Sequence, residues 1–336
     1  MGVNRVRIGV NGFGRMGKLA TRFLLDSETC QVVHINEKIS DVHGSAYLLE
    51  FDSIHGKIGK TVQVEDGKIV VGEHVITHST FDTPGSVPWG EYGVDIVLEC
   101  SGQFNNSEAL EAYFRHGVKR VVVSAPVTGE LNVVIGCNES LVTPEHKIVT
   151  AASCTTNCIG PVIKCIDEAF GIEHGAINTI HNITNTQSIM DCPNTKKSDL
   201  RRARAGMTNL APTSTGSAKA ITMIFPHLTG KLNGVAIRVP LQNASITDLT
   251  LELKEEVTVE QVNAALKASA DDVILGFEMR PLVSTDYTND TRSSIVDGAS
   301  TQVIDKKLVK ILAWYDNEFG YAKRMADLTH IVAGQL

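Results

Sequence analysis

The sequence of 336 residues predicts an α/β protein of two domains, the first built on a doubly wound parallel sheet and the second an α+β domain with a mainly antiparallel sheet. Three observations support this prediction. Short β-branched runs alternate with helical patterns in the first half, which is typical of a parallel sheet. Longer strands with alternating polarity follow residue 175. The chain also exceeds the length at which a single hydrophobic core usually stops growing.

The elements of the first half follow one another in a regular order. Strands are expected at VRIGV, QVVHI, DIVLEC, KRVVVS and KIVTA. Helices are expected from about Arg15, over VHGSAYLLEF and over SEALEAYFRHG. Residues 61–80 carry DG and GE turns between alternating strands, so they predict an antiparallel insertion.

The second half is expected to contain longer strands, at GAINTIHNIT, NGVAIRVP, ASITDLTLELK and TQVIDKKLVKILAWYD. The last segment, EFGYAKRMADLTHIVAG, has apolar residues at helical spacing. We therefore expect a first domain over residues 1–151 and a second over residues 152–317. A C-terminal helix over residues 318–336 is expected to pack back on the first domain.

Composition excludes several classes of function. The formal net charge of −7 argues against binding to nucleic acid or to an anionic membrane. The basic cluster KKSDLRRAR (196–204) has no interleaved aromatic residues, so a non-catalytic RNA-binding role is disfavoured. The apolar runs fall far short of the roughly 18 residues that span a bilayer. With no apolar leader at the N-terminus, a cytoplasmic protein is expected.

The cysteines indicate a reduced protein with one special thiol. Seven cysteines, an odd number, are scattered through a chain too long to need disulfides for stability. Cys154 and Cys158 form C-x3-C with no second pair nearby, which is poor spacing for zinc ligands, so no metal is expected. We interpret Cys154 as a catalytic thiol. Cys158, one helical turn later, is interpreted as a packing residue, with a regulatory disulfide as the alternative.

A glycine-rich loop follows the first strand. NGFGRMG places Gly12, Gly14 and Gly17 at G-x-G-x-x-G spacing, and Glu37 ends the second strand about 20 residues later. This pattern predicts a Rossmann dinucleotide site, in which the carboxylate binds ribose hydroxyls. NAD is the preferred cofactor. NADP stays possible, because Lys38 and Ser40 follow Glu37 and can bind a 2′-phosphate.

Cys154 lies where the apolar run HKIVTA gives way to a helical stretch, CIGPVIKCIDEAF. Because the N-terminus of a helix stabilises a thiolate, we expect a lowered pKa and a nucleophilic role. His181 ends the strand GAINTIH and is the candidate base, although a lone histidine is more often structural. Nearby hydroxyl, guanidinium and helix N-terminal groups predict binding of anions. These groups belong to Ser153, Thr155, Thr184, Thr215, Gly216 and Arg238.

Six motifs taken together, NGFGRMG, ASCTTNC, TIH, PTSTG, IRVP and WYDNEFGYA, resemble the phosphorylating glyceraldehyde-3-phosphate dehydrogenases over nearly the whole chain. The resemblance implies that Cys154 is the nucleophile, that His181 activates it, and that the six anion-binding residues hold two phosphates. It further implies a homotetramer. The residues that it implies for the dinucleotide are Arg15, Met16, Ser124 and Asn317, with Tyr321 close by.

The implied reaction explains why a thiol is needed. An aldehyde would form a hemithioacetal with Cys154, and His181 would take the hydroxyl proton as hydride leaves for the nicotinamide. The resulting thioester would then be attacked by inorganic phosphate to release an acyl phosphate.

Three features depart from the usual family pattern. Glu37 stands in place of the usual Asp, and T-N-T-Q replaces T-N-D-Q, so that Thr186 replaces a carboxylate. The stretches NEK, TIHNITNTQ and RPLVSTDYTNDTRSSIVDG resemble the branch associated with bacterial arsenate resistance, in which arsenate gives 1-arseno-3-phosphoglycerate. Erythrose-4-phosphate dehydrogenase, which also carries this Glu, is the rival enzyme. The retained PTSTG favours glyceraldehyde 3-phosphate.

Overall fold

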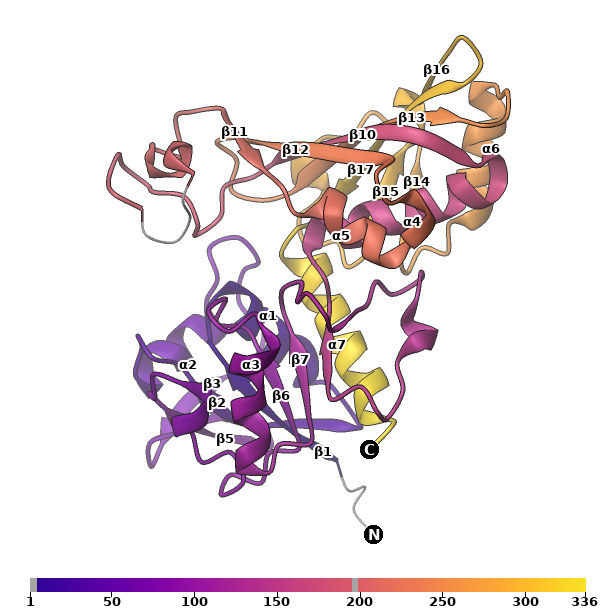
Figure 1. Cartoon of the computed structure of the whole chain (residues 1–336). Helices are drawn as coiled ribbons and strands as arrows, with labels where there is room; N and C mark the ends of the chain where they lie inside the picture. Colours follow the sequence, from indigo (N-terminus) through magenta and orange to yellow (C-terminus); the bar gives the residue numbers. More distant parts are fainter. Residues whose placement is uncertain (1–4, 195–198) are drawn as a thin grey trace. The chain divides into compact units, whose positions relative to one another are not determined.

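The structure is a computed structural model that describes residues 5–194 and 199–336. The chain forms two compact units (Figure 1). One unit contains the residues up to Ser153 together with Ala322–Leu336, and the other contains Cys154–Tyr321. The first part of the basic cluster, Lys196 to Ser198, lies outside the described residues.

A mostly parallel sheet forms the centre of the first unit. Its strands are β1 (Val6–Asn11), β2 (Cys30–Asn36), β3 (Val62–Glu65), β4 (Lys68–Val71), β5 (His74–Ser79), β6 (Ile96–Glu99), β7 (Arg120–Val123), β8 (Leu131–Asn132) and β9 (Ile148–Thr150). They follow the order β3-β4-β5-β2-β1-β6-β7-β9-β8. Only β3, β4 and β5 pair antiparallel, which confirms the predicted insertion. The doubly wound parallel sheet is therefore confirmed.

The strand order reverses between β1 and β6, which are parallel neighbours in the middle of this sheet. Ligands of doubly wound sheets bind at such a reversal, outside the carboxyl ends of the strands. Ile8 and Val10 of β1 and Ile96, Val97 and Leu98 of β6 are fully buried, as expected where a sheet is covered on both faces. At the carboxyl ends, the buried residues become polar: Asn11, Asn36 and Glu99.

Helices of the first unit are α1 (Arg15–Leu24), α2 (Val42–Glu50), α3 (Ser107–Leu110) and most of α7 (Phe319–Ala333). The predicted helix over SEALEAYFRHG is α-helical only in its first turn. Residues 111–116 wind as a tighter 3₁₀-helix, and Gly117 ends it in a left-handed conformation with φ of 81°. His330 of α7 lies 2.8 Å from the Ser27 hydroxyl.

The second unit contains a mixed, mainly antiparallel sheet, as predicted. Its strands are β10 (Ile172–His181), β11 (Ala211–Ser214), β12 (Leu232–Arg238), β13 (Ser245–Leu253), β14 (Leu275–Glu278), β15 (Ser294–Asp297), β16 (Gln302–Ile304) and β17 (Leu308–Tyr315). The order is β11-β12-β10-β13-β17-β15-β14, with β16 on β17. Two pairs, β10 with β12 and β14 with β15, are parallel.

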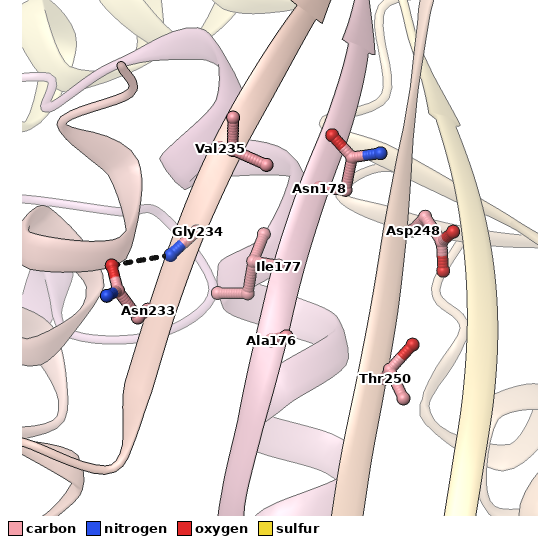
Figure 2. A pocket seen from close by; sticks show the side chains of 8 residues that line it. All are labelled: Ala176, Ile177, Asn178, Asn233, Gly234, Val235, Asp248 and Thr250. Carbon is pink, nitrogen blue, oxygen red and sulfur yellow. Dashed lines mark hydrogen bonds between the residues drawn. The ribbon is translucent and has the colours of Figure 1, made fainter. Parts of the chain in front are cut away.

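Three helices pack against this sheet: α4 (Cys154–Phe170), α5 (Ser217–Ile224) and α6 (Val259–Ser269). Burial alternates strictly along β13 and β17, so one face of the sheet is covered and the other is not. A hollow of about 380 Å³ lies across β10, β12 and β13 (Figure 2). It is lined by Ala176, Ile177, Asn178, Asn233, Gly234, Val235, Asp248 and Thr250.

The predicted single strand TQVIDKKLVKILAWYD is instead a hairpin of β16 and β17. Asp305 and Lys306 form the turn, with φ of 47° and 65°. Two successive left-handed residues match the twist of a tight hairpin, which is why the chain reverses here. Within the described residues, no helix is both long and apolar enough to cross a membrane.

Candidate active site

Cys154 begins helix α4, four residues after strand β9 ends at Thr150. Between them, Ala152 has a left-handed backbone with φ of 52°. That conformation is strained for a residue with a side chain, and such strain is concentrated at functional sites. Hydrogen bonds from the backbone N–H groups of Cys154 and Thr155 favour the thiolate form of Cys154.

His181, the last residue of β10, faces this thiol. Its Nε2 lies 3.7 Å from Cys154 Sγ. Its Nδ1 lies 2.8 Å from the carbonyl oxygen of Asn182, which can only accept. A ring proton on Nδ1 satisfies this contact and leaves Nε2 to accept a proton from Sγ. Arg238 Nη1, which can only donate, lies 2.8 Å from the same Nδ1 and 3.3 Å from the Asn182 carbonyl oxygen, and in this tautomer it donates to the carbonyl.

The surroundings favour the neutral forms of both groups. Burial raises the pKa of Cys154, and the positive charge of Arg238 opposes this only in part. Burial and Arg238 together lower the pKa of His181 to about 3. The expectation of a lowered thiol pKa was therefore wrong, because the loss of water outweighs the helix N-terminus.

Arg202 brings a second guanidinium to the surroundings of His181, and its charge also lowers the pKa of that imidazole. Only 7% of Arg202 is exposed. Its Nη1 donates to Thr186 Oγ1 at 2.6 Å, and Thr186 Oγ1 lies 2.8 Å from Thr184 Oγ1. The hydroxyl of Thr184, predicted from the sequence to bind an anion, is thus joined to this guanidinium through Thr186.

The two arginines form no salt bridge with a carboxylate of the described residues, although the charge of Asp199 acts on Arg202. Nε of Arg238 is buried without any hydrogen-bond partner in the same part of the chain. Burial lowers the pKa of both groups, yet an arginine stays charged in proteins. Buried guanidinium groups that form no salt bridge are suited to an anionic ligand.

The remaining anion-site predictions fall on two helix N-termini. Thr155, in the first turn of α4, has its hydroxyl 2.9 Å from the Tyr315 hydroxyl. Thr215 and Gly216 precede α5, which packs against α4 and against β12, the strand of Arg238. Thr215 Oγ1 accepts from Ser217 N at 3.2 Å. Ser153, the last residue of the first unit, is partly exposed.

The glycine loop of the first unit has the local geometry that a dinucleotide needs. Gly12 has φ of 88°, and a Cβ there would come within 2.5 Å of the Ser101 backbone. A Cβ on Gly17 would lie 2.1 Å from the Gly12 oxygen. At Gly14, by contrast, nothing lies within 4 Å of a Cβ position. Two glycines thus permit close packing, and the third leaves open space beside the N-terminus of α1.

Glu37 braces this loop. Its Oε2 accepts from Phe13 N at 2.6 Å, and its Oε1 accepts from Ile39 N at 2.9 Å. The carboxylate is thereby fixed beside the loop, where its remaining lone pairs can accept from ribose hydroxyls. Lys38, which kept NADP possible, forms a salt bridge of 2.9 Å with Asp82.

Other predicted cofactor residues are distributed over both units. Arg15 forms an ion pair with Asp52, which also accepts from Lys18 Nζ at 2.7 Å. Met16 follows on α1, and Ser124 N donates to the Glu99 backbone oxygen at 2.9 Å. In the second unit, Asn317 is buried and its Oδ1 accepts from Ser245 Oγ at 3.1 Å, while Tyr321 is 5% exposed.

Cys158 is fully buried, with Sγ 3.4 Å from the hydroxyl of Thr247 and 3.6 Å from that of Ser294. Burial raises its pKa to about 12. These contacts agree with the interpretation of Cys158 as a packing residue, and the thiol is free in the structure. Among the residues that the structure describes, no group of His, Cys, Asp and Glu could hold a metal ion.

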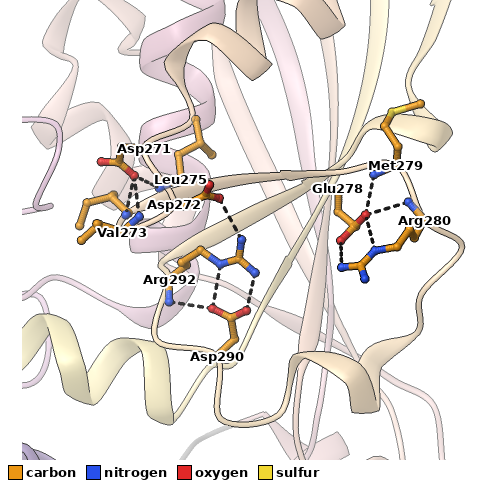
Figure 3. Close-up of polar contacts among 10 residues, drawn as sticks. Asp271, Asp272, Val273, Leu275, Glu278, Met279, Arg280, Asp290 and Arg292 are labelled. Atoms are coloured by element: carbon orange, nitrogen blue, oxygen red, sulfur yellow. Dashed lines mark hydrogen bonds and ion pairs between the residues drawn. The ribbon is translucent and has the colours of Figure 1, made fainter.

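The motif RPLVSTDYTNDTRSSIVDG begins just after β14 and ends just after β15. Its charged side chains pair locally: Arg292 donates to Asp290 at 2.7 and 3.0 Å, and Arg280 donates to Glu278 (Figure 3). Asp271 in the neighbouring turn accepts from three backbone N–H groups. The charges of this motif therefore stabilise the loop in which they lie.

Sequence reasoning missed two residues of this site. Arg202 was counted in the basic cluster 196–204; Asp199 caps a short 3₁₀-helix that buries Arg202 and leaves Arg201 and Arg204 exposed. Nothing in the run RRAR distinguishes the buried arginine from the two exposed ones.

Tyr315 is the second residue that was missed. It hydrogen-bonds Thr155 and Thr179 and presents its ring edge-on to His181, with 6.1 Å between the ring centroids. Its place next to the predicted Asn317 was the available signal.

Comparisons with known proteins agree across the whole chain. Residues 6–107 match the family model described as the glyceraldehyde 3-phosphate dehydrogenase NAD binding domain, and residues 153–317 match that of the C-terminal domain. The chain is 52% identical to glyceraldehyde-3-phosphate dehydrogenase 3 of Nostoc sp., with 98% of each chain covered. It is 45% identical to glyceraldehyde-3-phosphate dehydrogenase of Geobacillus stearothermophilus, with 98% and 99% covered. These matches cover both the glycine loop and the contact between Cys154 and His181, and they show that this chain belongs to the glyceraldehyde-3-phosphate dehydrogenase family.

Proposed function

We propose that this protein oxidises glyceraldehyde 3-phosphate with NAD and phosphorylates the product through a thioester on Cys154. The observation that carries the proposal is the 3.7 Å contact between Cys154 Sγ and His181 Nε2, beside two guanidinium groups that form no salt bridge among the described residues. In this proposal, residues 1–151 with the C-terminal helix bind the dinucleotide, and residues 152–317 carry the chemistry.

The first unit fits the cofactor by its own geometry. Gly14 leaves room for a pyrophosphate at the N-terminus of α1, and the fixed carboxylate of Glu37 suits a ribose. We assign Arg15, Met16, Ser124, Asn317 and Tyr321 to the same cofactor. NAD supplies the acceptor for the hydride that leaves the substrate.

The proton chemistry belongs to His181. As Cys154 Sγ bonds to the aldehyde carbon, Nε2 takes the thiol proton and returns it to the aldehyde oxygen, which gives a hemithioacetal. Nε2 then removes this hydroxyl proton while hydride departs, so that a thioester remains. An oxygen of phosphate next bonds to the thioester carbon, the C–S bond breaks, and the proton on Nε2 returns to Sγ.

Bound anions prepare His181 for this work. Burial and the charges of Arg238 and Arg202 lower the pKa of the imidazole. A phosphate group held by these arginines offsets their charges, so the basicity of Nε2 rises when substrate is present. The proposed anion ligands are these arginines with Ser153, Thr155, Thr184, Thr215 and Gly216.

A single-turnover experiment tests the proposal. Without phosphate, the enzyme should release about one NADH per chain and carry an acyl group on Cys154, detectable by mass spectrometry of peptides. Added phosphate should remove that group. The exposed Cys192 offers a matched control, since Cys192→Ser should leave the burst intact. Turnover without any acyl group on Cys154 would refute the thioester.

Arsenate is proposed as a second oxyanion substrate, with arsenate resistance as the biological role. Thr186 supports this proposal, because a neutral hydroxyl stands beside Arg202 where the resembled family has a carboxylate. Hydroxyl and guanidinium donors do not discriminate strongly between two tetrahedral oxyanions of similar size and charge. Deletion of the gene should raise sensitivity to arsenate without impairing growth on sugars. Loss of growth on sugars with unchanged arsenate tolerance would place the enzyme in central carbon metabolism.

A homotetramer is proposed from the exposed apolar surface of the second unit. Ile189, Met190, Leu200 and Leu210 are each at least 70% exposed, and Val235 on the open sheet face is 42% exposed. Further copies of the chain would cover such a surface. Sedimentation should show a tetramer that Leu200→Asp weakens, while Val273→Asp, at another exposed position, leaves it intact. A monomeric wild-type protein would contradict the proposal.

A further inference from the structure

A buried carboxylate lies at the point where the order of strands in the first sheet reverses. Glu99 ends β6 and pairs in register with Asn11, which ends β1. Glu99 is 1% exposed and Asn11 is 3% exposed. No lysine or arginine among the described residues pairs with this carboxylate, and burial raises its pKa. A charged group in such a place needs hydrogen-bond donors on both oxygens.

Four donors meet the two oxygens of Glu99. Oε2 accepts from Asn11 Nδ2 at 2.7 Å and from the Tyr113 hydroxyl. Oε1 accepts from Ser101 N at 2.7 Å and from Ser101 Oγ at 2.5 Å. Both hydroxyls already accept an N–H, from Asn11 and from Gln103, so each directs its proton at the carboxylate. The geometry therefore fits an ionised acceptor.

The same carboxylate connects two loops. Ser101 lies in the loop after β6, and its backbone packs closely on Gly12. A Cβ atom on Gly12 would lie 2.5 Å from the Ser101 backbone. Asn11 precedes the glycine loop directly, and its Oδ1 accepts from Asn36 Nδ2 at 2.8 Å at the end of β2. Glu99 thereby fixes the Ser101 loop against the glycine loop. These loops border the crevice where a doubly wound sheet binds its ligand.

We propose that Glu99 is a positioning residue for the dinucleotide: by holding Ser101, it keeps the loop after β6 in contact with the glycine loop and so sets the affinity for NAD. The inference rests on the NAD-dependent function given above. It assigns Glu99 no part in the proton chemistry of Cys154 and His181.

The variant Glu99→Gln tests this role because an amide cannot satisfy the site in either orientation. One orientation places the NH₂ group against Asn11 Nδ2, and the other places it against Ser101 N, and neither of those nitrogens can accept. We expect the Kd for NAD, measured by calorimetry, to rise about tenfold. The kcat at saturating NAD and the KM for the aldehyde should change less than twofold.

Tyr113→Phe is the matched control. It removes a donor from the same buried carboxylate, but on the oxygen that does not hold Ser101. This variant should lower the melting temperature and keep the NAD affinity within twofold of wild type. Equal losses of affinity in both variants would mean general destabilisation and would overturn the proposal.

Ser101→Ala provides a second test in case Glu99→Gln does not fold. It removes only the hydroxyl donor on a partly exposed residue. The Kd for NAD should rise about threefold, and an unchanged value would overturn the proposal. If the wild-type protein bound no NAD, the proposed function itself would fail; wild-type affinity in Glu99→Gln would refute only the role of Glu99.

Discussion

Replacing Thr186 by aspartate would place a carboxylate in direct contact with Arg202, which forms no salt bridge among the described residues. Thr186 Oγ1 accepts a hydrogen bond of 2.6 Å from Arg202 Nη1, and only 7% of Arg202 is exposed. A carboxylate oxygen at the same place would form an ion pair with this guanidinium. Nη2 is engaged on another side, 3.4 Å from Thr213 Oγ1. The substrate anion would then compete with the introduced carboxylate for one edge of Arg202 only.

The expected size of the effect follows from that geometry. A hydrogen bond to a charged group contributes about 1.5–3 kcal/mol, and a unit charge about 4 Å away interacts by about 4 kcal/mol at an effective dielectric constant of about 20. Because only one edge of the guanidinium is lost, we take the lower figure of about 1.5 kcal/mol. This corresponds to roughly a tenfold weaker hold on the anion.

Steady-state kinetics with varied phosphate and with varied arsenate would measure this effect. Thr186→Asp should raise the KM for both oxyanions about tenfold, and raised ionic strength should change the ratio little because the pair is buried. Thr186→Val is the control, since it removes the hydroxyl and adds no charge; its KM should change less than threefold. An unchanged or lower KM in Thr186→Asp would refute the view that Arg202 is kept free for the anion.

Four further predictions concern the catalytic pair and the first unit. Cys154→Ser should abolish NADH formation while calorimetry still detects NAD binding, and retained turnover would exclude covalent catalysis. His181→Asn should slow acylation by about 10²–10⁴-fold in stopped-flow measurements; an unchanged pH–rate profile would remove it from the role of base. Asp82→Ala releases Lys38, so kcat/KM for NADP relative to NAD should rise about two- to fivefold, the size of an exposed ion pair, and a constant ratio would show that Lys38 does not reach the 2′ position. Burial alone would raise the pKa of Asp52, but hydrogen bonds from Lys18 and from the backbone hold it well below its usual range. Asp52 therefore stabilises the fold above its unfolded pKa of about 3.9, and this contribution is lost as the pH falls below that value. Asp52→Asn should cost about 3 kcal/mol at pH 7 in denaturant unfolding, with a gap to wild type that narrows below about pH 4; a gap independent of pH would contradict the assignment.

Much of the fold could be predicted from the sequence because its signals are local. Alternation of apolar runs with helical patterns identified the parallel strands and α1, and the glycine spacing identified the loop after β1. The two wrong predictions of secondary structure each concern one short segment. The turn at Asp305 and Lys306 was missed because the charged run DKK between two apolar runs lacks the glycine that usually marks such a hairpin. The winding of residues 111–116 as a 3₁₀-helix has no marker in the sequence either.

The sequence indicated several side chains that the structure brings together, but not the charge balance around them. Motif and spacing indicate Cys154, His181 and Arg238, which the structure brings into contact. Burial depends on residues distant in the sequence, so the raised pKa of Cys154 and the inward position of Arg202 could not be read from neighbouring letters. The sequence shows that Thr186 replaces the usual carboxylate, but it does not show that Arg202 is the residue that Thr186 contacts. Only the folded chain shows that the hydroxyl of Thr186 lies on a buried guanidinium.

The charge balance explains why a neutral catalytic pair is compatible with a reactive thiol. A thiolate and an imidazolium would be costly to bury, whereas a thiol and an imidazole are not. The two arginines cannot release their protons, so their charges add to burial in lowering the pKa of His181. In the proposed mechanism, an anionic substrate offsets these charges at the moment when a base is required. The proposal therefore ties proton transfer from Cys154 to the binding of phosphate.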